Sequence, residues 1–195
     1  MDRSAQNKIA FLTGIAVLTV LSIVLGLWFR GRTEARYDRQ ILAAAQRYRI
    51  DPALVKAVIW QESRFNAQAR GKAGEIGLMQ VREDAAFEWA DAEKLSGFSH
   101  EQILDPEKNI RCGTFYLSKV MKRYARADDP LPYALADYNA GRANVLRWNK
   151  GPAQTNSAAF LAGMDYPRTR EYAQRIMVRR SNYLRDFQGR QLALR

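Results

Sequence analysis

Residues 51–62 read DPALVKAVIWQE, a stretch that predicts a helix with a buried face. Asp51 is a typical N-cap residue, and Pro52 suits the first helical position because its backbone angle is already helical. Leu54, Val58 and Glu62 follow one another at intervals of four residues, so they lie on one side of this helix. A carboxylate is thereby placed at the end of an apolar stripe, close to the C-terminus of the helix.

This predicted environment of Glu62 should raise the pKa of its carboxyl group. Burial disfavours the charged form, and the negative end of the helix dipole disfavours a further negative charge. A carboxylic acid that stays protonated near neutral pH can serve as a general acid. From periodicity alone, a surface or capping role for Glu62 also stays open.

The chain beyond residue 30 is punctuated as a series of helices, so the predicted fold class is mainly α. Apolar residues recur at helical spacing over residues 34–48. Asp105 and Pro106 repeat the capping signal and open a helix to about Tyr124. The buried side of that helix is predicted to consist of Ile110, Gly113, Leu117, Val120, Met121 and Tyr124. Further predictions are helices over residues 130–141, 144–148 and 167–187, at most a small β-hairpin near residues 70–82, and a loop over residues 151–163.

The composition excludes several classes of protein. The 195 residues carry a formal net charge of +11, with one Cys and one His. Cys112 alone cannot form an internal disulfide or a cysteine-based zinc cluster, and His100 alone argues against His-rich metal sites. Because no nucleic-acid recognition module is visible, the positive charge favours an anionic polymer or membrane surface as partner.

Residues 9–29 form an uncharged run of 21 residues. As a helix this run reaches about 30 Å, the thickness of a bilayer core. A secretory signal peptide has a shorter apolar run, and Trp28 followed by Arg30 is typical of a membrane interface. We therefore expect a transmembrane signal anchor over residues 9–29, with a cytoplasmic N-terminus at 1–8 and a juxtamembrane stalk at 30–37.

Three short motifs follow one another along the chain: Gln61-Glu62-Ser63-Arg64-Phe65, Gly77-Leu78-Met79-Gln80 and Tyr138-Asn139-Ala140-Gly141. Supporting pieces are Leu104-Asp105-Pro106 with Asn109, Ile110 and Gly113, and Tyr166-Pro167-Arg168-Thr169-Arg170-Glu171-Tyr172. In this order they resemble the catalytic domain of lytic transglycosylases, the soluble-lytic-transglycosylase-like branch of the lysozyme superfamily. The resemblance covers roughly residues 38–187, and we place the catalytic domain at residues 38–190.

The resemblance implies a lysozyme-like α+β fold, peptidoglycan glycan strands as substrate, no cofactor and no metal. Glu62 matches the family's single catalytic acid, which protonates the glycosidic oxygen between N-acetylmuramic acid and N-acetylglucosamine and then accepts the proton of the muramic C6 hydroxyl. The product would end in 1,6-anhydromuramic acid. Residues that match the substrate-binding positions of the family are Ser63, Met79, Gln80, Tyr138, Asn139 and Tyr172.

From the residues alone, three of these positions have a structural interpretation as well. Met79 and Tyr172 are equally typical of a hydrophobic core. The Ser63 hydroxyl, at the end of a helix, can instead bond a backbone carbonyl.

Two residues depart from the pattern usual in the family. Glu75 stands where a small residue is usual, although some branches share it, and Asp137 stands where Ala is commoner. Goose-type lysozymes of the same superfamily keep a second acid in the hairpin that follows the catalytic helix, the region in which Glu75 lies. Two alternatives therefore stay open: a hydrolytic muramidase that uses Glu62 with Glu75 as a possible second carboxylate, and a catalytically silent glycan-binding scaffold.

The implied substrate also predicts a location. Because peptidoglycan lies outside the cytoplasmic membrane, we expect the catalytic domain in the periplasm and a single-pass anchor in the inner membrane. The expected partners are peptidoglycan glycan strands and, through residues 9–29, the cytoplasmic membrane; no nucleic acid is expected. The sequence identifies no cell-envelope assembly partner.

Overall fold

The computed structural model describes the backbone of residues 3–193 and the side chains of residues 12–26 and 31–188. The chain divides into two units, residues 1–37 and 38–195, and each is described by itself. Residues 1–2 of the predicted cytoplasmic segment lie outside the described residues.

The first unit is built on one long helix, α1 (Arg3–Ala35). Its described apolar side chains are exposed, for example Leu18 at 65% and Val20 at 60%. Among the described residues it is the one helix long and apolar enough to cross a membrane, judged by length and composition. The residues expected to form a stalk continue this helix as far as Ala35, and a turn at residues 36–37 follows. The helix expected from residue 34 therefore begins later, at Asp38.

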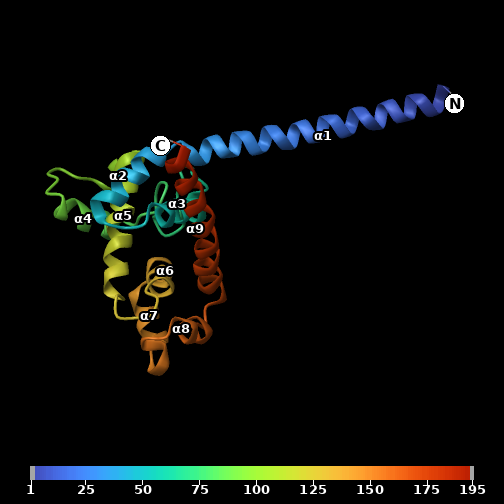
Figure 1. The fold of residues 1–195 in the computed structure, drawn as a ribbon. Helices are drawn as coiled ribbons and strands as arrows, with labels where there is room; N and C mark the ends of the chain where they lie inside the picture. The colour runs from blue at the N-terminus through green and yellow to red at the C-terminus, as the bar shows by residue number, and fades with distance from the viewer. Residues whose placement is uncertain (1–2, 194–195) are drawn as a thin grey trace. The chain divides into compact units, whose positions relative to one another are not determined.

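The second unit consists of helices packed around a central one, and the longest of them is the C-terminal helix α9 (Figure 1). Its elements are α2 (Asp38–Tyr48), α3 (Pro52–Ser63), α4 (Glu83–Ala92), η1 (His100–Leu104), α5 (Pro106–Arg123), α6 (Leu131–Ala140), α7 (Arg142–Trp148), η2 (Gly151–Gln154), α8 (Ser157–Gly163) and α9 (Pro167–Ala193). Within the described residues the β structure consists of two isolated bridges, Arg70 to Ile76 and Ile76 to Val81. The predicted mainly α fold, with at most a small hairpin near residues 70–82, is thus confirmed.

Helix α3 occupies the centre of this unit, and its first two turns are buried on every side. Residues 53–59 are all buried, and α3 packs against both α2 and α9. Lys56 is buried among them, and its ammonium group donates a hydrogen bond to Asp38 at 2.6 Å. Both predicted caps are present: the carboxylate of Asp51 accepts from the Ala53 N–H and that of Asp105 from the Lys108 N–H, each at 2.9 Å.

One segment was predicted wrongly. Residues 151–163 contain η2 and α8 where a loop was expected. Asn156 caps α8 by accepting a hydrogen bond from the Ala159 N–H at 2.8 Å, and Phe160 is fully buried. A helix of two turns is too short to show a periodic stripe, so its stability comes from this cap and from one buried ring.

On α5, five of the six residues predicted to be buried are buried, and Met121 is half-exposed instead. Met121 lies on the edge of the apolar stripe, where the last turn of the helix meets solvent. Helices α4 and η1 had not been predicted, because residues 83–104 show no clear capping or periodic signal of their own.

The loop between α3 and α4 is held in place by one buried side chain, Asn109 of α5. Its Oδ1 accepts from the Met79 N–H at 2.8 Å, and its Nδ2 donates to the carbonyls of Ile76 at 3.0 Å and Ile103 at 2.9 Å. Gly77 passes so close that an added Cβ would lie 2.0 Å from Asn109 Nδ2, and its φ is +79°. The amide of Asn109 therefore replaces the backbone partners that a sheet would supply to this loop.

Replacing Asn109 by Ala should destabilise the fold by removing the partner of the Met79 N–H and of the Ile103 carbonyl. The Ile76 carbonyl keeps its hydrogen bond from the Val81 N–H at 3.1 Å. We expect a loss of about 3 kcal/mol, which lowers the apparent Tm by about 10 °C. The measurement is thermal unfolding of the full chain in detergent, followed by circular dichroism. Asn182→Ala, on the exposed side of α9, is the control, and an Asn109→Ala protein that melts with it would contradict the role given to Asn109.

Candidate active site

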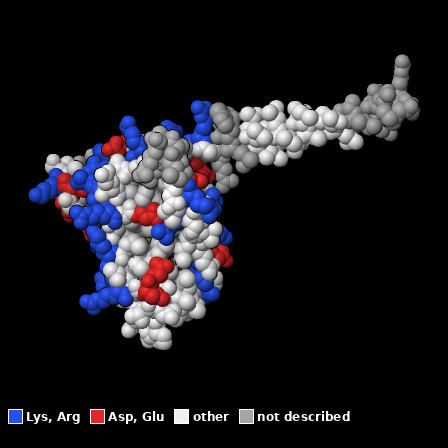
Figure 2. Space-filling view, in the orientation of Figure 1, with Lys and Arg blue, Asp and Glu red and all other residues white. Residues whose placement is uncertain are grey.

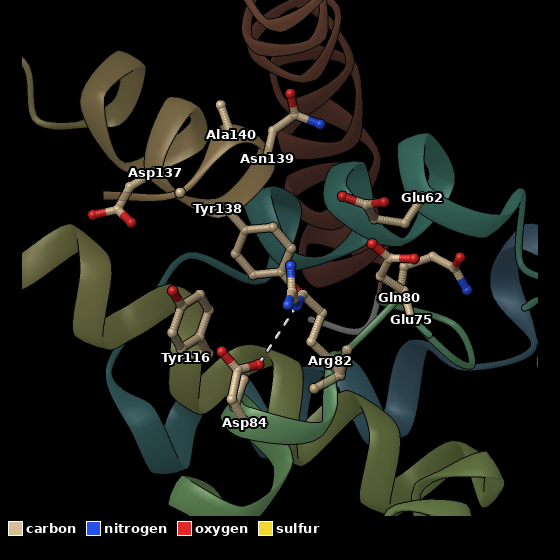
Figure 3. A pocket seen from close by; sticks show the side chains of 13 residues that line it. Glu62, Glu75, Gln80, Arg82, Asp84, Tyr116, Asp137, Tyr138, Asn139 and Ala140 are labelled. Carbon is tan, nitrogen blue, oxygen red and sulfur yellow. Dashed lines mark ion pairs between the residues drawn. The ribbon is translucent and has the colours of Figure 1, made fainter. Parts of the chain in front are cut away.

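A cleft of about 340 Å³ opens between the end of α3, the loop before α4, and helices α5 and α6. Figure 3 shows its side chains, which converge from segments far apart in the sequence. Its lining includes Glu62, Glu75, Gln80, Arg82, Asp84, Tyr116, Asp137, Tyr138, Asn139 and Gly141. The cleft therefore brings together five of the eight candidate site residues named from the sequence with several residues that were not named. Ser63, Met79 and Tyr172 are not among its lining residues.

Glu62 lies in the last turn of α3 and is half-buried at the wall of this cleft. The hydroxyl of Tyr172, on α9, donates a hydrogen bond to Glu62 Oε1 at 2.5 Å. The pKa of Glu62 is raised from 4.5 to about 7, chiefly because burial disfavours the carboxylate. The negative charge of Glu75 raises the pKa further, while the hydrogen bond from Tyr172 lowers it.

Tyr172 is almost fully buried, and it remains a hydrogen-bond donor over the working pH range. Burial, together with the neighbouring charge of Glu62, raises the pKa of its phenol well above the usual value. The tyrosine thus fixes one oxygen of Glu62 and leaves the other oxygen, Oε2, for a substrate. This arrangement suits a carboxyl group that gives up a proton and later takes one back.

Glu75 lies in the glycine-rich loop, and its carboxylate faces the same pocket as Glu62 (Figure 3). Its Oε2 accepts a hydrogen bond from the Ala73 N–H at 3.1 Å. A Cβ added at Gly71 would lie 2.2 Å from that oxygen, so the loop closes tightly around the carboxylate. Glu75 is therefore held by its own loop, near enough to Glu62 to influence the pKa of that residue.

Tyr138 connects α6 with the loop that Asn109 holds. Its hydroxyl donates to the carbonyl of Met79 at 2.9 Å, and its ring packs against Tyr116 with 5.6 Å between centroids. The side chain of Met79 is fully buried, and a Cβ added at Gly113 would lie 2.5 Å from its sulfur. The thioether of Met79 thus packs in the core. The Met79 backbone carbonyl contributes to the cleft indirectly, by accepting the hydrogen bond that holds Tyr138.

Gln80 has a positive φ of 45° and turns its amide back into the loop. Its Nε2 donates to the carbonyls of Gly77 at 2.9 Å and Ala69 at 3.2 Å. Gln80 lines the pocket while it fixes the loop. Ser63 donates its hydroxyl to the Ile59 carbonyl at 3.2 Å, the backbone bond expected of a helix-terminal serine.

Asn139 is exposed in the cleft, and a residue outside the cleft lining fixes the orientation of its amide. The hydroxyl of Thr169, a buried residue in the first turn of α9, donates to Asn139 Oδ1 at 2.9 Å. Because the amide oxygen is thereby engaged, the Asn139 Nδ2 group is the end available to a ligand. Thr169 belongs to the motif of residues 166–172, which by itself indicates no role for it.

Asp137 contributes to the pocket wall, but its charge is engaged elsewhere. Its Oδ2 accepts from the Tyr124 hydroxyl at 2.6 Å and pairs with Arg123 of α5. Figure 3 shows its carboxylate turned away from Glu62. Among the described residues, no group of three His, Cys, Asp or Glu side chains is arranged to hold a metal ion.

Comparisons with known proteins agree with this geometry. The family described as Transglycosylase SLT domain matches residues 39–161. The chain is 30% identical over 142 residues to the soluble lytic murein transglycosylase of Escherichia coli (strain K12), covering 72% of this chain and 21% of that protein. It is 32% identical over 155 residues to the membrane-bound lytic murein transglycosylase C of Yersinia pestis (strain Pestoides F), covering 75% of this chain and 43% of that protein.

The fold is likewise similar to that of the lytic transglycosylase Slt from Pseudomonas aeruginosa, with a TM-score of 0.72 at 25% identity. That similarity covers 79% of this chain and 25% of the other. The chain therefore belongs to the Transglycosylase SLT domain family. It spans less than half the length of these relatives.

The two neighbours of Glu62 should move its pKa in opposite directions when they are changed. Tyr172→Phe removes a hydrogen bond to the carboxylate, so the pKa should rise; Glu75→Gln removes a negative charge, so the pKa should fall. The measurement is a pH titration of the side-chain carboxyl signals by carbon NMR, with Glu62 assigned by its loss in Glu62→Gln. Asp84 lines the same pocket, and the control variant Asp84→Asn should leave the Glu62 pKa unchanged. Shifts of the Glu62 pKa in the same direction in Tyr172→Phe and Glu75→Gln would contradict this electrostatic assignment.

Proposed function

We propose that this chain is a membrane-anchored peptidoglycan lytic transglycosylase in which Glu62 is the single general acid and base. The observation that carries the proposal is the position of Glu62: in a cleft, hydrogen-bonded to Tyr172, and with a pKa of about 7. The family to which the chain belongs and the names of its relatives support the substrate.

The reaction takes two proton transfers at one carboxyl group. Protonated Glu62 donates to the glycosidic oxygen between N-acetylmuramic acid and N-acetylglucosamine, and the bond to muramic C1 breaks. Glu62, now a carboxylate, accepts the proton of the muramic C6 hydroxyl, which closes onto C1 and forms the 1,6-anhydro ring. A group whose pKa lies near the working pH can do both steps, because neither protonation state is strongly disfavoured.

The residues around Glu62 support the charge that develops on the sugar. Asn139 presents its Nδ2 group to the cleft, where it can donate to the N-acetyl carbonyl. Tyr138, whose proton is engaged by Met79, offers its oxygen lone pairs to the same space. The Tyr138 oxygen can stabilise the positive charge of an oxocarbenium-like transition state, while Asn139 orients the acetamido group. Neither side chain has to reorganise during the reaction.

The location that fits this substrate is the periplasmic face of the cytoplasmic membrane. Helix α1 has the length and composition of a membrane span, and one relative is a membrane-bound lytic murein transglycosylase. We propose residues 9–29 as a single-pass anchor, with residues 1–8 in the cytoplasm and residues 38–190 as the periplasmic catalytic domain.

A second candidate function is a hydrolytic muramidase that uses Glu75 to activate water. The shared pocket and the effect of Glu75 on the Glu62 pKa favour it. The hydrogen bond from Ala73 to the Glu75 carboxylate favours a held electrostatic role instead. Glu75→Gln separates the two: a lytic transglycosylase should keep most of its turnover, whereas a hydrolase that needs a water-activating base should lose it.

Replacing Glu62 by Gln should abolish turnover, because the amide cannot donate or accept the proton in either step. We expect a loss of about a hundredfold or more in the rate at which purified sacculi release soluble muropeptides. In the wild type the same rate should fall as pH rises through about 7, where Glu62 loses its proton. Residual activity within about tenfold of wild type would contradict the single-acid mechanism.

The fold should survive this substitution and gain stability at alkaline pH. The pKa of Glu62 is raised in the folded state, so its ionisation opposes folding as pH rises from 4.5 to about 7. Gln does not ionise, and the variant therefore escapes that cost. An apparent Tm for Glu62→Gln at or above the wild-type value at alkaline pH shows that lost turnover is not lost structure.

Replacing Thr169 by Val keeps the volume of the side chain but removes the hydroxyl that fixes the Asn139 amide. We expect kcat/KM to fall by about tenfold, the worth of one hydrogen bond that orients a substrate ligand. Thr169→Ser keeps the hydroxyl and should stay close to wild type. A Ser variant that loses as much as the Val variant would assign Thr169 to packing alone.

A further inference from the structure

Arg82 is the one Lys or Arg side chain among the residues that line the described cleft. Its side chain is 62% exposed, and its one ion-pair partner among the described residues is Asp84, with 3.7 Å from Nε to Oδ1. Asp84 is itself 78% exposed. An exposed pair at this distance contributes little to stability, so the guanidinium keeps its hydrogen-bonding capacity for a ligand.

The local structure gives no reason for an arginine at this position. Arg82 is the N-cap residue of α4, but its side chain makes no capping hydrogen bond. A positive charge at a helix N-terminus is disfavoured by the helix dipole, and Ser, Thr, Asp or Asn is preferred there. The groups that shift the Glu62 pKa are Tyr172 and Glu75, together with burial, and Arg82 is not among them.

The surroundings of Arg82 indicate what it binds. The remaining charged residues of the cleft are Glu62, Glu75, Asp84 and the paired Asp137. Figure 3 shows Arg82 extending into the same pocket as Glu62 and Tyr138. A guanidinium in a cleft that is otherwise acidic is suited to a carboxylate, which it binds through two parallel N–H donors.

We propose that Arg82 recognises a carboxylate of the acidic peptide stem carried by the muramic acid. The site then selects strands whose stems carry free carboxylates. This inference rests on the proposed function, because the bond cleaved there belongs to the sugar that bears the stem. In an intact strand the lactyl carboxyl group of the muramic acid is bound in the amide to the stem and the sugar hydroxyls are neutral, so the free carboxylates of the strand belong to the stem.

The test compares two preparations of uncross-linked strands from the same sacculi: strands with intact stems, and strands whose stem carboxylates have been converted to neutral amides. The full chain in detergent micelles is assayed for kcat/KM by counting anhydro ends. Variants are Arg82→Gln, Arg82→Lys and Arg126→Gln. Figure 2 shows Lys and Arg side chains spread over the surface, so the exposed Arg126, outside the cleft, controls for a loss of general charge attraction.

We expect the wild type and Arg126→Gln to prefer strands with free stem carboxylates by about tenfold, and Arg82→Gln to lose that preference. Arg82→Lys, which keeps the charge but not the paired donors, should recover part of it. The inference is overturned if Arg82→Gln keeps the preference, loses both substrates equally, or if the wild type shows none. If the wild type forms no anhydro ends from either substrate, the proposed function itself fails.

Discussion

The architecture of the cleft depends on three hydrogen bonds made by the buried amide of Asn109. They fix a loop that has almost no β structure of its own, and Gly77 passes too close to Asn109 to allow a side chain at that position. The Met79 carbonyl that orients Tyr138 belongs to this loop, and so does Glu75, whose charge raises the pKa of Glu62. A mainly helical protein thereby builds one wall of its site from irregular backbone, because a single side chain satisfies the polar groups that burial would otherwise leave unpaired.

Long helices and their caps were predictable from the sequence. Asp51 and Asp105 cap as expected, because a carboxylate before proline satisfies orphan N–H groups whatever the tertiary context. The two-turn helix α8 was not predictable from periodicity, because one buried residue, Phe160, and one cap, Asn156, do not form a repeating apolar pattern. The start of α2 at Asp38 is likewise set by the turn before it, and the apolar pattern alone extended the helix too far.

The candidate site divides in the same way. The row of Leu54, Val58 and Glu62 predicted a buried carboxyl group with a raised pKa, and the structure shows a pKa of about 7. The partners come from segments distant in sequence: Tyr172 lies 110 residues from Glu62, and Thr169 acts from behind Asn139. Only the motif resemblance pointed to Tyr172. Arg82 and Tyr116 carried no sequence signal, since an exposed arginine and a helical tyrosine acquire meaning only from the cleft they share.

The most direct test of a single-acid mechanism is the origin of the oxygen at the cleaved end. Sacculi are digested by the full chain in water enriched in heavy oxygen, and the muropeptides are weighed by mass spectrometry. Ring closure by the C6 hydroxyl predicts products that are lighter by one water and carry no heavy oxygen. Reducing ends that contain heavy oxygen would contradict that mechanism, and would make Glu75 the base that activates water.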